Sequence, residues 1–210
     1  VFQGLLPPFV DSVAAVFIWL WFINLFNFMD GIDGVAGVQA TGIGVGVAVV
    51  ASSAALAPVH MIFGMVAAAS ALGLLLWNWH PAKIFMGDVG SVGFGYLLGW
   101  LLLVLAANGH WAAAVILPMY FVADATITLV RRAIARQTLW HAHREHFYQR
   151  AAAAVGNHAS VTRAVLMSQI GLVILAGFVA AVPGVEASGV LAAAVLVAAL
   201  LWYLRRIAAR

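Results

Sequence analysis

Long apolar runs constrain the fold of this chain more than any other feature of its sequence. Only 8% of the 210 residues are charged, too few to cover the surface of a soluble domain. A helix needs roughly 20 mostly apolar residues to cross a bilayer. Seven runs are about that long, at residues 9–29, 37–56, 59–79, 90–107, 111–130, 163–182 and 188–204. We therefore predict an all-α fold, a polytopic membrane helix bundle forming a single domain over residues 1–210.

The basic residues are distributed asymmetrically over the predicted loops. If the spans alternate in direction, the loops at 30–36, 80–89 and 131–162 and the tail from 205 lie on one side of the membrane. All ten basic residues fall there: Lys83, Arg131, Arg132, Arg136, Arg144, Arg150, Arg163, Arg205, Arg206 and Arg210. Basic loops mark the cytoplasmic side, so the isoelectric point of about 9.8 is a topology signal and requires no nucleic acid partner. The absence of Cys excludes thiolate chemistry and disulfides.

The stretch NLFNFMDGIDGVAG, at 24–37, places four polar side chains at the end of the first predicted span. Asn24, Asn27 and Asp30 are spaced to share one face of a helix. The glycines that follow are expected to end that helix and to bring Asp33 to the same place. A helix cap with solvated carboxylates is one interpretation, because ionisable residues cost little at the end of a span. Two Asn and two Asp exceed what a cap requires, which favours a polar site.

The stretch HPAKIFMGDVGS, at 80–91, combines a lysine, a carboxylate and a glycine-rich helix start. The backbone N–H groups of such a helix start attract anions. A carboxylate at Asp88 can hold Mg²⁺, which binds one or two carboxylates together with phosphate oxygens. Lys83 lies beside this loop. The alternative is a solvated loop in which Asp88 caps the following helix.

The predicted loop that begins at residue 131 is rich in arginine and histidine, with His141, His143 and His146 in its first part. It suits anionic lipid headgroups or the oxygens of a diphosphate, which arginine binds in a bidentate fork. Zinc is disfavoured in this loop because it contains neither Cys nor a His pair with ligand spacing.

Asp124 lies inside the fifth predicted span, where a carboxylate needs a partner. We expect Arg131 or a polar residue of another span to supply it. A purely structural ion pair is an equal alternative.

Two of these stretches resemble the signatures of the polyprenyl-phosphate N-acetylhexosamine-1-phosphate transferases. NLFNFMDGIDGVAG is similar to the family motif N-x-x-N-x-x-D-G-x-D-G, and KIFMGDVGS is similar to its F-M-G-D-x-G-S loop. The resemblance covers about residues 18–150. DATITLVRR and HAHREHFYQR look most like the branch that initiates O-antigen synthesis. Arg144 and Glu145 interrupt the run of adjacent histidines that is typical of the muramoyl-pentapeptide branch.

The resemblance implies transfer of a sugar-1-phosphate from a UDP-N-acetylhexosamine to undecaprenyl phosphate, at the cytoplasmic face of a bacterial inner membrane. It implies Mg²⁺ as cofactor, with Mn²⁺ as an alternative. The implied catalytic residues are Asp30, Asp33 and Asp88, of which Asp30 and Asp88 bind the metal. The implied substrate-binding residues are Asn24, Asn27, Lys83, His143, Arg144 and His146. Membrane lipid surrounds the chain, and a homodimer is compatible with the sequence.

The chain departs from that family in two respects. The family carries an adjacent Asp-Asp pair on an earlier span, and no Asp-Asp occurs here. The family also has about ten or eleven spans, more than the seven runs counted above. We expect a fragment that lacks N-terminal spans and that is inactive alone.

Two other classes of protein remain as alternatives to an enzyme. A transporter would carry broken helices and ionisable groups at the membrane midplane, whereas most polar clusters here fall at span ends. A non-catalytic scaffold could bind anionic lipid through residues 131–150.

Overall fold

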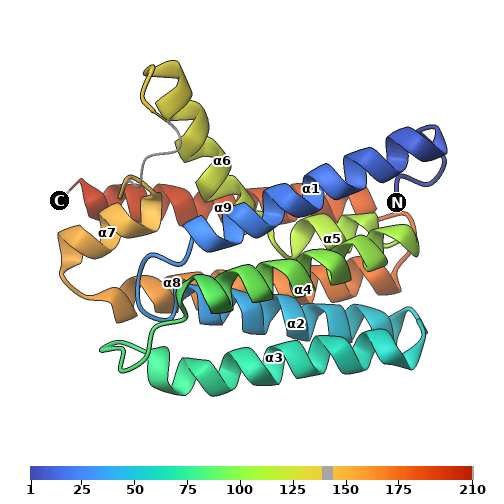
Figure 1. Cartoon of the computed structure of the whole chain (residues 1–210), viewed down its shortest axis with the longest axis horizontal. Helices are drawn as coiled ribbons and strands as arrows, with labels where there is room; N and C mark the ends of the chain where they lie inside the picture. Colours follow the sequence, from blue (N-terminus) through green and yellow to red (C-terminus); the bar gives the residue numbers. More distant parts are fainter. Residues whose placement is uncertain (139–143, 210) are drawn as a thin grey trace.

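A computed structural model describes residues 1–138 and 144–209, and within them every regular element is an α-helix. The helices are α1 (Pro8–Phe28), α2 (Val35–Ser53), α3 (Pro58–Asn78), α4 (Gly87–Ala107), α5 (Trp111–Ile116), α6 (Met119–Ile134), α7 (Phe147–Val155), α8 (His158–Ala181) and α9 (Glu186–Ala208). Figure 1 shows the long helices running roughly side by side along one axis, with α6 leaning out of the bundle. The predicted all-α bundle is confirmed.

In the part of the chain that the structure describes, six helices are long and apolar enough to cross a membrane: α1, α2, α3, α4, α8 and α9. Each corresponds to one predicted run, with ends shifted by a few residues. The largest shift is at α8, which begins at His158 rather than 163. Its start is fixed by Asn157, whose side-chain oxygen accepts a hydrogen bond from the Ser160 N–H at 3.3 Å.

The predicted run at 111–130 differs from the other six because it is broken into α5 and α6. Pro118 follows the last turn of α5. Proline has no N–H to donate and its ring clashes with the preceding turn, so a continuous helix is disfavoured here. The carbonyl of Leu117 accepts hydrogen bonds from Nε2 of Gln39 at 3.2 Å and of Gln169 at 3.1 Å. Two buried carboxamides therefore satisfy the polar group that the break exposes.

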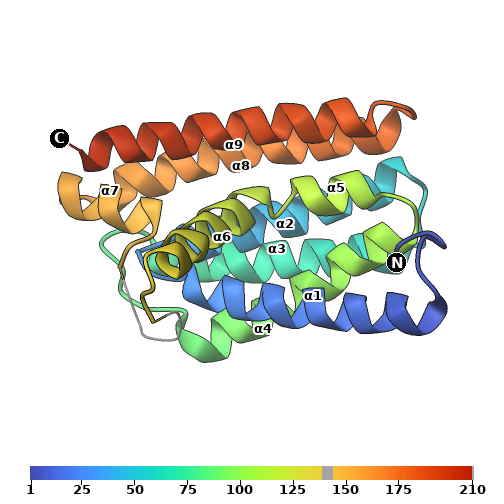
Figure 2. The same ribbon diagram turned by 90° about the horizontal axis from the view of Figure 1, so that it is seen from above.

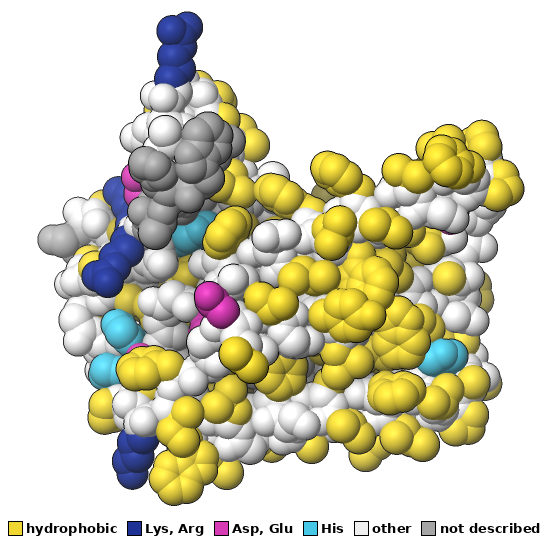
Figure 3. All heavy atoms as spheres, viewed as in Figure 1, with side chains coloured by type: hydrophobic (Ala, Val, Ile, Leu, Met, Phe, Trp, Pro, Cys, Tyr) yellow, Lys and Arg dark blue, Asp and Glu magenta, His cyan; other side chains and the backbone are white. Residues whose placement is uncertain are grey.

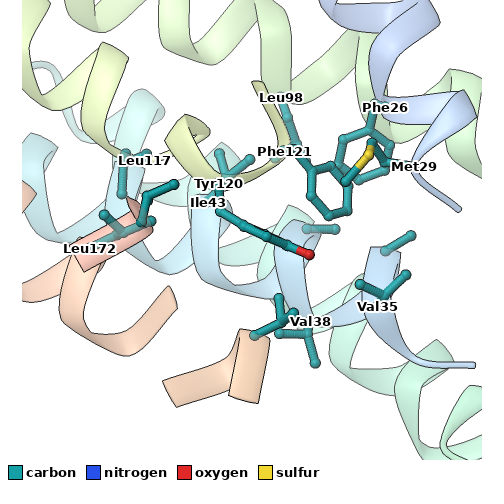
Figure 4. Close-up of a cluster of buried hydrophobic side chains, with 14 of the residues drawn as sticks. Phe26, Met29, Val35, Val38, Ile43, Leu98, Leu117, Tyr120, Phe121 and Leu172 are labelled. Atoms are coloured by element: carbon teal, nitrogen blue, oxygen red, sulfur yellow. The ribbon is translucent and has the colours of Figure 1, made fainter. Parts of the chain in front are cut away.

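Helix α2 is the centre of the bundle and packs against α3 on one side and α8 on another. Gly44 of α2 and Gly64 of α3 let the two backbones approach closely: a Cβ at Gly64 would lie 2.8 Å from the Gly44 carbonyl oxygen. Small residues serve such approaches in membrane helices. The core beside α2 collects apolar side chains from α1, α4, α6 and α8, several of which are labelled in Figure 4. Figure 2 shows α8 and α9 as a pair along one side, and α1 and α4 on the side opposite.

The connections that the sequence assigns to one side of the membrane lie at one end of the bundle. The loops after α1 and α3 and the turn between α7 and α8 meet at the left of Figure 1, and the N-terminus lies at the other end. In the space-filling view, Lys and Arg side chains gather at that same left end, and apolar side chains cover much of the remaining face (Figure 3). We name this end, with the three connections at 29–34, 79–86 and 156–157, the basic end.

Candidate active site

The connection between α1 and α2 forms one wall of the site. Helix α1 ends at Phe28, and Gly34, with φ of +78°, begins α2 from the left-handed region that glycine adopts without strain. The Gly34 N–H donates to Oδ1 of Asn78 at 2.9 Å, and Nδ2 of Asn78 donates to the Ile84 carbonyl at 2.9 Å. Asn78 is buried and joins the loop after α1 to the loop after α3. The two loops that carry the predicted carboxylates are thus held together by one carboxamide.

Asp30, in the loop after α1, and Asp88, at the start of α4, form an acidic pair. Asp30 follows the end of α1 and is half-buried, whereas Asp88 lies in the first turn of α4 and is exposed. Burial, and secondly the negative charge of Asp88, raise the pKa of Asp30 to about 6. The two residues predicted to share a metal ion are thus near enough for the charge of Asp88 to raise the pKa of Asp30.

Exposed apolar side chains flank the acidic pair. Phe28 precedes Asp30 on the chain, and Phe85 and Val89 lie on either side of Asp88. Val89 is 94% exposed and Phe85 is 72% exposed. The pair thus lies where the polar end of the bundle meets its apolar surface.

The two predicted asparagines differ in their surroundings. Oδ1 of Asn27 accepts a hydrogen bond from Oγ of Ser91 at 3.0 Å, which links α1 to the first turns of α4 beside the acidic pair. Asn24 is exposed, and its Nδ2 donates to the Leu20 carbonyl one turn earlier at 2.7 Å. Asn27 is therefore part of the site, and among the described residues the hydrogen bond of Asn24 stays within its own helix.

Asp33 lies in a second cluster at the same end, between two histidines. Its Oδ2 is 2.7 Å from Nδ1 of His80 and accepts the Ala82 N–H at 3.2 Å. Its Oδ1 is 3.3 Å from Nδ1 of His158. Burial of Asp33 acts to raise its pKa, but the hydrogen bonds from His80, Ala82 and His158 outweigh it, so the pKa of Asp33 lies below its ordinary value. Asp33 is thus held ionised, in contrast to Asp30.

The predicted basic and histidine residues lie at the same end but are dispersed. Lys83 is exposed, with Nζ 5.6 Å from the centre of the Trp77 ring. Arg144 is exposed, and His143 lies outside the described residues. Neither the placement of Lys83 nor that of Arg144 tests a contact with substrate, so the roles of Lys83, His143 and Arg144 stay predictions.

His146 is buried rather than open to a substrate, with 2% of its surface exposed. Its Nδ1 lies 3.3 Å from Oδ1 of Asp124. The Asp124 carboxylate also accepts the Phe147 N–H at 3.1 Å and the Tyr148 N–H at 3.4 Å, so it caps the start of α7. Asp124 thus finds its partners in His146 and in the amino end of α7, and the residue expected first, Arg131, is not among them.

Arginines of α6 and α7 line a cavity of about 140 Å³ with Glu145 at the basic end. Arg132 is buried there and donates from Nη1 to Oε1 of Glu145 at 2.6 Å and from Nη2 to the Thr138 carbonyl at 2.7 Å. Arg131 and Arg150 also line the cavity. This concentration of guanidinium groups gives the basic end a positive field that attracts anions from water.

Sequence reasoning missed three residues that organise the site: Asn78, His80 and His158. His80 opens the stretch HPAKIFMGDVGS but was given no role there, and no motif contains Asn78 or His158. The predicted topology was the available signal, because it put the loop at 80–89 and the loop at 131–162 on the same side as Asp33.

Comparison with known proteins gives one family. A model described as glycosyl transferase family 4 matches residues 2–106. A probable undecaprenyl-phosphate N-acetylglucosaminyl 1-phosphate transferase of Bacillus subtilis (strain 168) is 32% identical over 139 residues, which are 62% of this chain and 38% of that protein.

Phospho-N-acetylmuramoyl-pentapeptide-transferases match as well. That of Lacticaseibacillus paracasei is 33% identical over 131 residues, 58% of this chain and 40% of that protein. That of Deinococcus radiodurans is 36% identical over 88 residues, 42% of this chain and 25% of that protein. The matched stretches thus span between 25% and 40% of these three relatives.

Proposed function

The chain belongs to glycosyl transferase family 4, and on that premise we propose that it carries the site for transfer of N-acetylhexosamine-1-phosphate from a UDP-sugar to undecaprenyl phosphate. An oxygen of the acceptor phosphate attacks the phosphorus that bears the sugar. The bond from that phosphorus to UMP breaks, giving undecaprenyl-diphospho-sugar and UMP. The observation that carries the proposal is the acidic pair, Asp30 and Asp88, which converges from the end of α1 and the start of α4.

The acidic pair fits the Mg²⁺ that family membership implies. The raised pKa of Asp30 reports its burial and, secondly, repulsion by the neighbouring carboxylate of Asp88. One or two carboxylates plus phosphate oxygens are the ligands that Mg²⁺ takes in such sites. When bound, Mg²⁺ neutralises the diphosphate and polarises the phosphorus under attack. Asp30 and Asp88 would hold it.

The chain's own groups position the anionic substrates. Asn27 and Ser91 keep the end of α1 against the start of α4, so that the two carboxylates stay adjacent. The first N–H groups of α4 lack partners within the helix and favour an anion at this place. Arg144 and the arginines of α6 and α7 attract the donor and spread charge as UMP departs.

The sugar and the pathway are the finer part of the proposal. We assign the chain to initiation of O-antigen or another cell-envelope polysaccharide, because Arg144 and Glu145 interrupt the histidine run of the muramoyl-pentapeptide branch. We also place the basic end at the cytoplasmic face of a bacterial inner membrane, where UDP-sugars are available. The relatives named above act on different sugars by their names, so the donor is to be identified by assay.

UMP release by the natural gene product in membranes, measured across a panel of UDP-N-acetylhexosamines with undecaprenyl phosphate, tests the proposal. We expect release with one donor and a fall of about 100-fold or more in Asp88→Asn, the loss typical of one electrostatic group. Glu186→Gln, a carboxylate change at the opposite end of the bundle, is the matched control and should release UMP at the unchanged rate. Near-normal release by Asp88→Asn, or substrate transport without UMP, would overturn the proposal.

A further inference from the structure

Three side chains from separate elements meet at the basic end outside the acidic pair. Asp33 comes from the connection between α1 and α2, His80 from the loop after α3, and His158 from the first position of α8. One nitrogen of each histidine and one carboxylate oxygen all lie within 4.8 Å of one another. The two imidazole rings are 5.1 Å apart between centres. We propose that these three residues form a binding site for a divalent transition metal of the Zn²⁺ type.

Each histidine nitrogen lies near one oxygen of the Asp33 carboxylate, at a distance that can be compared with the spacing that such an ion imposes. Zinc binds imidazole nitrogen at about 2.0–2.1 Å and carboxylate oxygen at about 2.0–2.2 Å, so its ligand atoms lie roughly 3.3 Å apart in a tetrahedral site. Nδ1 of His158 is 3.3 Å from Oδ1 of Asp33. Nδ1 of His80 is 2.7 Å from Oδ2, so ligation requires the His80 ring to withdraw by about half an ångström.

Nδ1 of His158 faces both an acceptor and a donor of Asp33. It lies 3.3 Å from Oδ1, to which its protonated form donates, and 3.4 Å from the backbone N–H, from which its unprotonated form accepts. A metal ion at this cluster would take the unprotonated form.

Asp33 is held through one bond to its carboxylate and two bonds to the backbone at residues 33 and 34. Oδ2 of Asp33 accepts the Ala82 N–H at 3.2 Å, and the Asp33 carbonyl accepts Oγ1 of Thr162, one turn into α8, at 2.8 Å. The neighbouring Gly34 N–H is held by Asn78. Such outer bonds orient a ligand before the ion arrives, as in known metal sites.

The chemistry of the donors distinguishes this site from the acidic pair. Two imidazoles and one carboxylate suit Zn²⁺, Co²⁺ or Mn²⁺, whereas Mg²⁺ selects oxygen ligands. The side chains of His80 and His158 are 30% and 38% exposed, so water can supply the remaining coordination position and the ion can enter from solution. A metal here would fasten the loops after α1 and α3 to the start of α8.

Metal binding to the purified full-length protein tests this site without reference to transferase activity. The protein is produced without a polyhistidine tag, stripped with chelator, and titrated with Co²⁺ while its visible absorption is recorded, with Zn²⁺ as competitor. We expect one tight Co²⁺ site per chain with an absorption band of a low-coordinate ion. His80→Ala and His158→Ala should each weaken binding by more than the ~10–100-fold typical of an outer-shell change.

Matched variants exclude other sources of the signal. Asp88→Asn, which alters the acidic pair, and the double variant His141→Ala/His143→Ala should both retain the site. Thermal unfolding serves as the folding check: Zn²⁺ should raise the melting temperature of the wild type and of these two controls, and leave that of His80→Ala unchanged. Absence of any Co²⁺ band in the wild type, or a band that survives in both His80→Ala and His158→Ala, would overturn the proposal and leave the cluster as a hydrogen-bond network only.

Discussion

At the scale of single residues, Asp30 and Asp33 show how two carboxylates three positions apart acquire different chemistry. Asp33 accepts hydrogen bonds and is held ionised. Asp30 is buried beside another negative charge, and its pKa is raised to about 6. Burial without donors favours the protonated form, and donors favour the charged form. Of these two carboxylates, only Asp30 therefore changes charge near physiological pH.

This difference predicts a pH-dependent affinity for Mg²⁺. Below about pH 6 Asp30 holds a proton in the folded protein, and Mg²⁺ must displace it. The apparent affinity, measured by isothermal titration calorimetry on metal-free protein, should therefore rise as the pH increases from 5 to 7, with proton release that fades above pH 7. Asp30→Asn should bind more weakly and lose most of the pH dependence. An affinity that is flat with pH in the wild type would contradict this assignment.

The same shift sets the sign of a stability effect. The folded state binds a proton at Asp30 more tightly than the unfolded state, where the pKa is near 3.8. The contribution of Asp30 to the free energy of unfolding is therefore fully present below about pH 4 and is lost as the pH rises through about 6. A cation bound at Asp30 would take the place of the proton and offset this loss of stability at higher pH.

At the scale of elements, α7 depends on a carboxylate from α6. Asp124 accepts the N–H groups of Phe147 and Tyr148, the first two residues of α7. Because the Tyr148 donor is buried with Asp124 and the Phe147 donor is partly buried, loss of the acceptor leaves both without this partner.

We expect Asp124→Ala to destabilise α7 by about 1–2 kcal/mol, the usual value of a helix cap. Hydrogen exchange at Phe147 and Tyr148 should accelerate accordingly. Asn157→Ala, which removes the cap of α8, should instead accelerate exchange at Ser160. Unchanged protection from hydrogen exchange at the start of α7 in Asp124→Ala would show that the cap does not stabilise this helix.

The contact between α2 and α3 depends on glycine at Gly64. A methyl group there would lie 2.8 Å from the Gly44 carbonyl and 2.9 Å from the Ala48 nitrogen, both backbone atoms that cannot turn aside. Gly64→Ala should lower stability by about 1–3 kcal/mol through overpacking, seen as a lower melting temperature in detergent. Gly73→Ala is the control within the same helix, because no atom lies within 4 Å of its added methyl. Equal melting temperatures for the two variants would refute the close approach.

At the scale of the whole molecule, the basic end gives the bundle a direction in the membrane. The chain has no Cys, so a single introduced Cys is the only thiol. We expect the thiol of the Arg136→Cys variant to react with an impermeant maleimide only when the cytoplasmic face is accessible. The thiol of the Asn108→Cys variant should react only from the outer side. Labelling of both positions from one side would contradict the orientation.

The sequence predicted those features of the fold and of the site that depend on local composition, and it did not predict most of those that depend on contacts between distant segments. Apolar length marked the six continuous spans, and loop charge gathered the basic end, because both depend on the chain's own composition. The motifs predicted that Asp30 and Asp88 meet. The break at Pro118 has a local cause that the continuous apolar run concealed. The burial of His146 and the two histidines around Asp33 depend on contacts between distant segments, which no spacing along the chain encodes.

The exposed Phe28, Phe85 and Val89 beside the acidic pair have a consequence for how an isoprenoid phosphate would reach it. Its tail could remain dissolved among acyl chains while the head group slides sideways into place. The water-soluble nucleotide would arrive from the opposite direction. Under the proposed function, the two substrates would therefore enter the site by separate routes. The lipid-linked product would diffuse away in the plane of the bilayer without leaving the membrane.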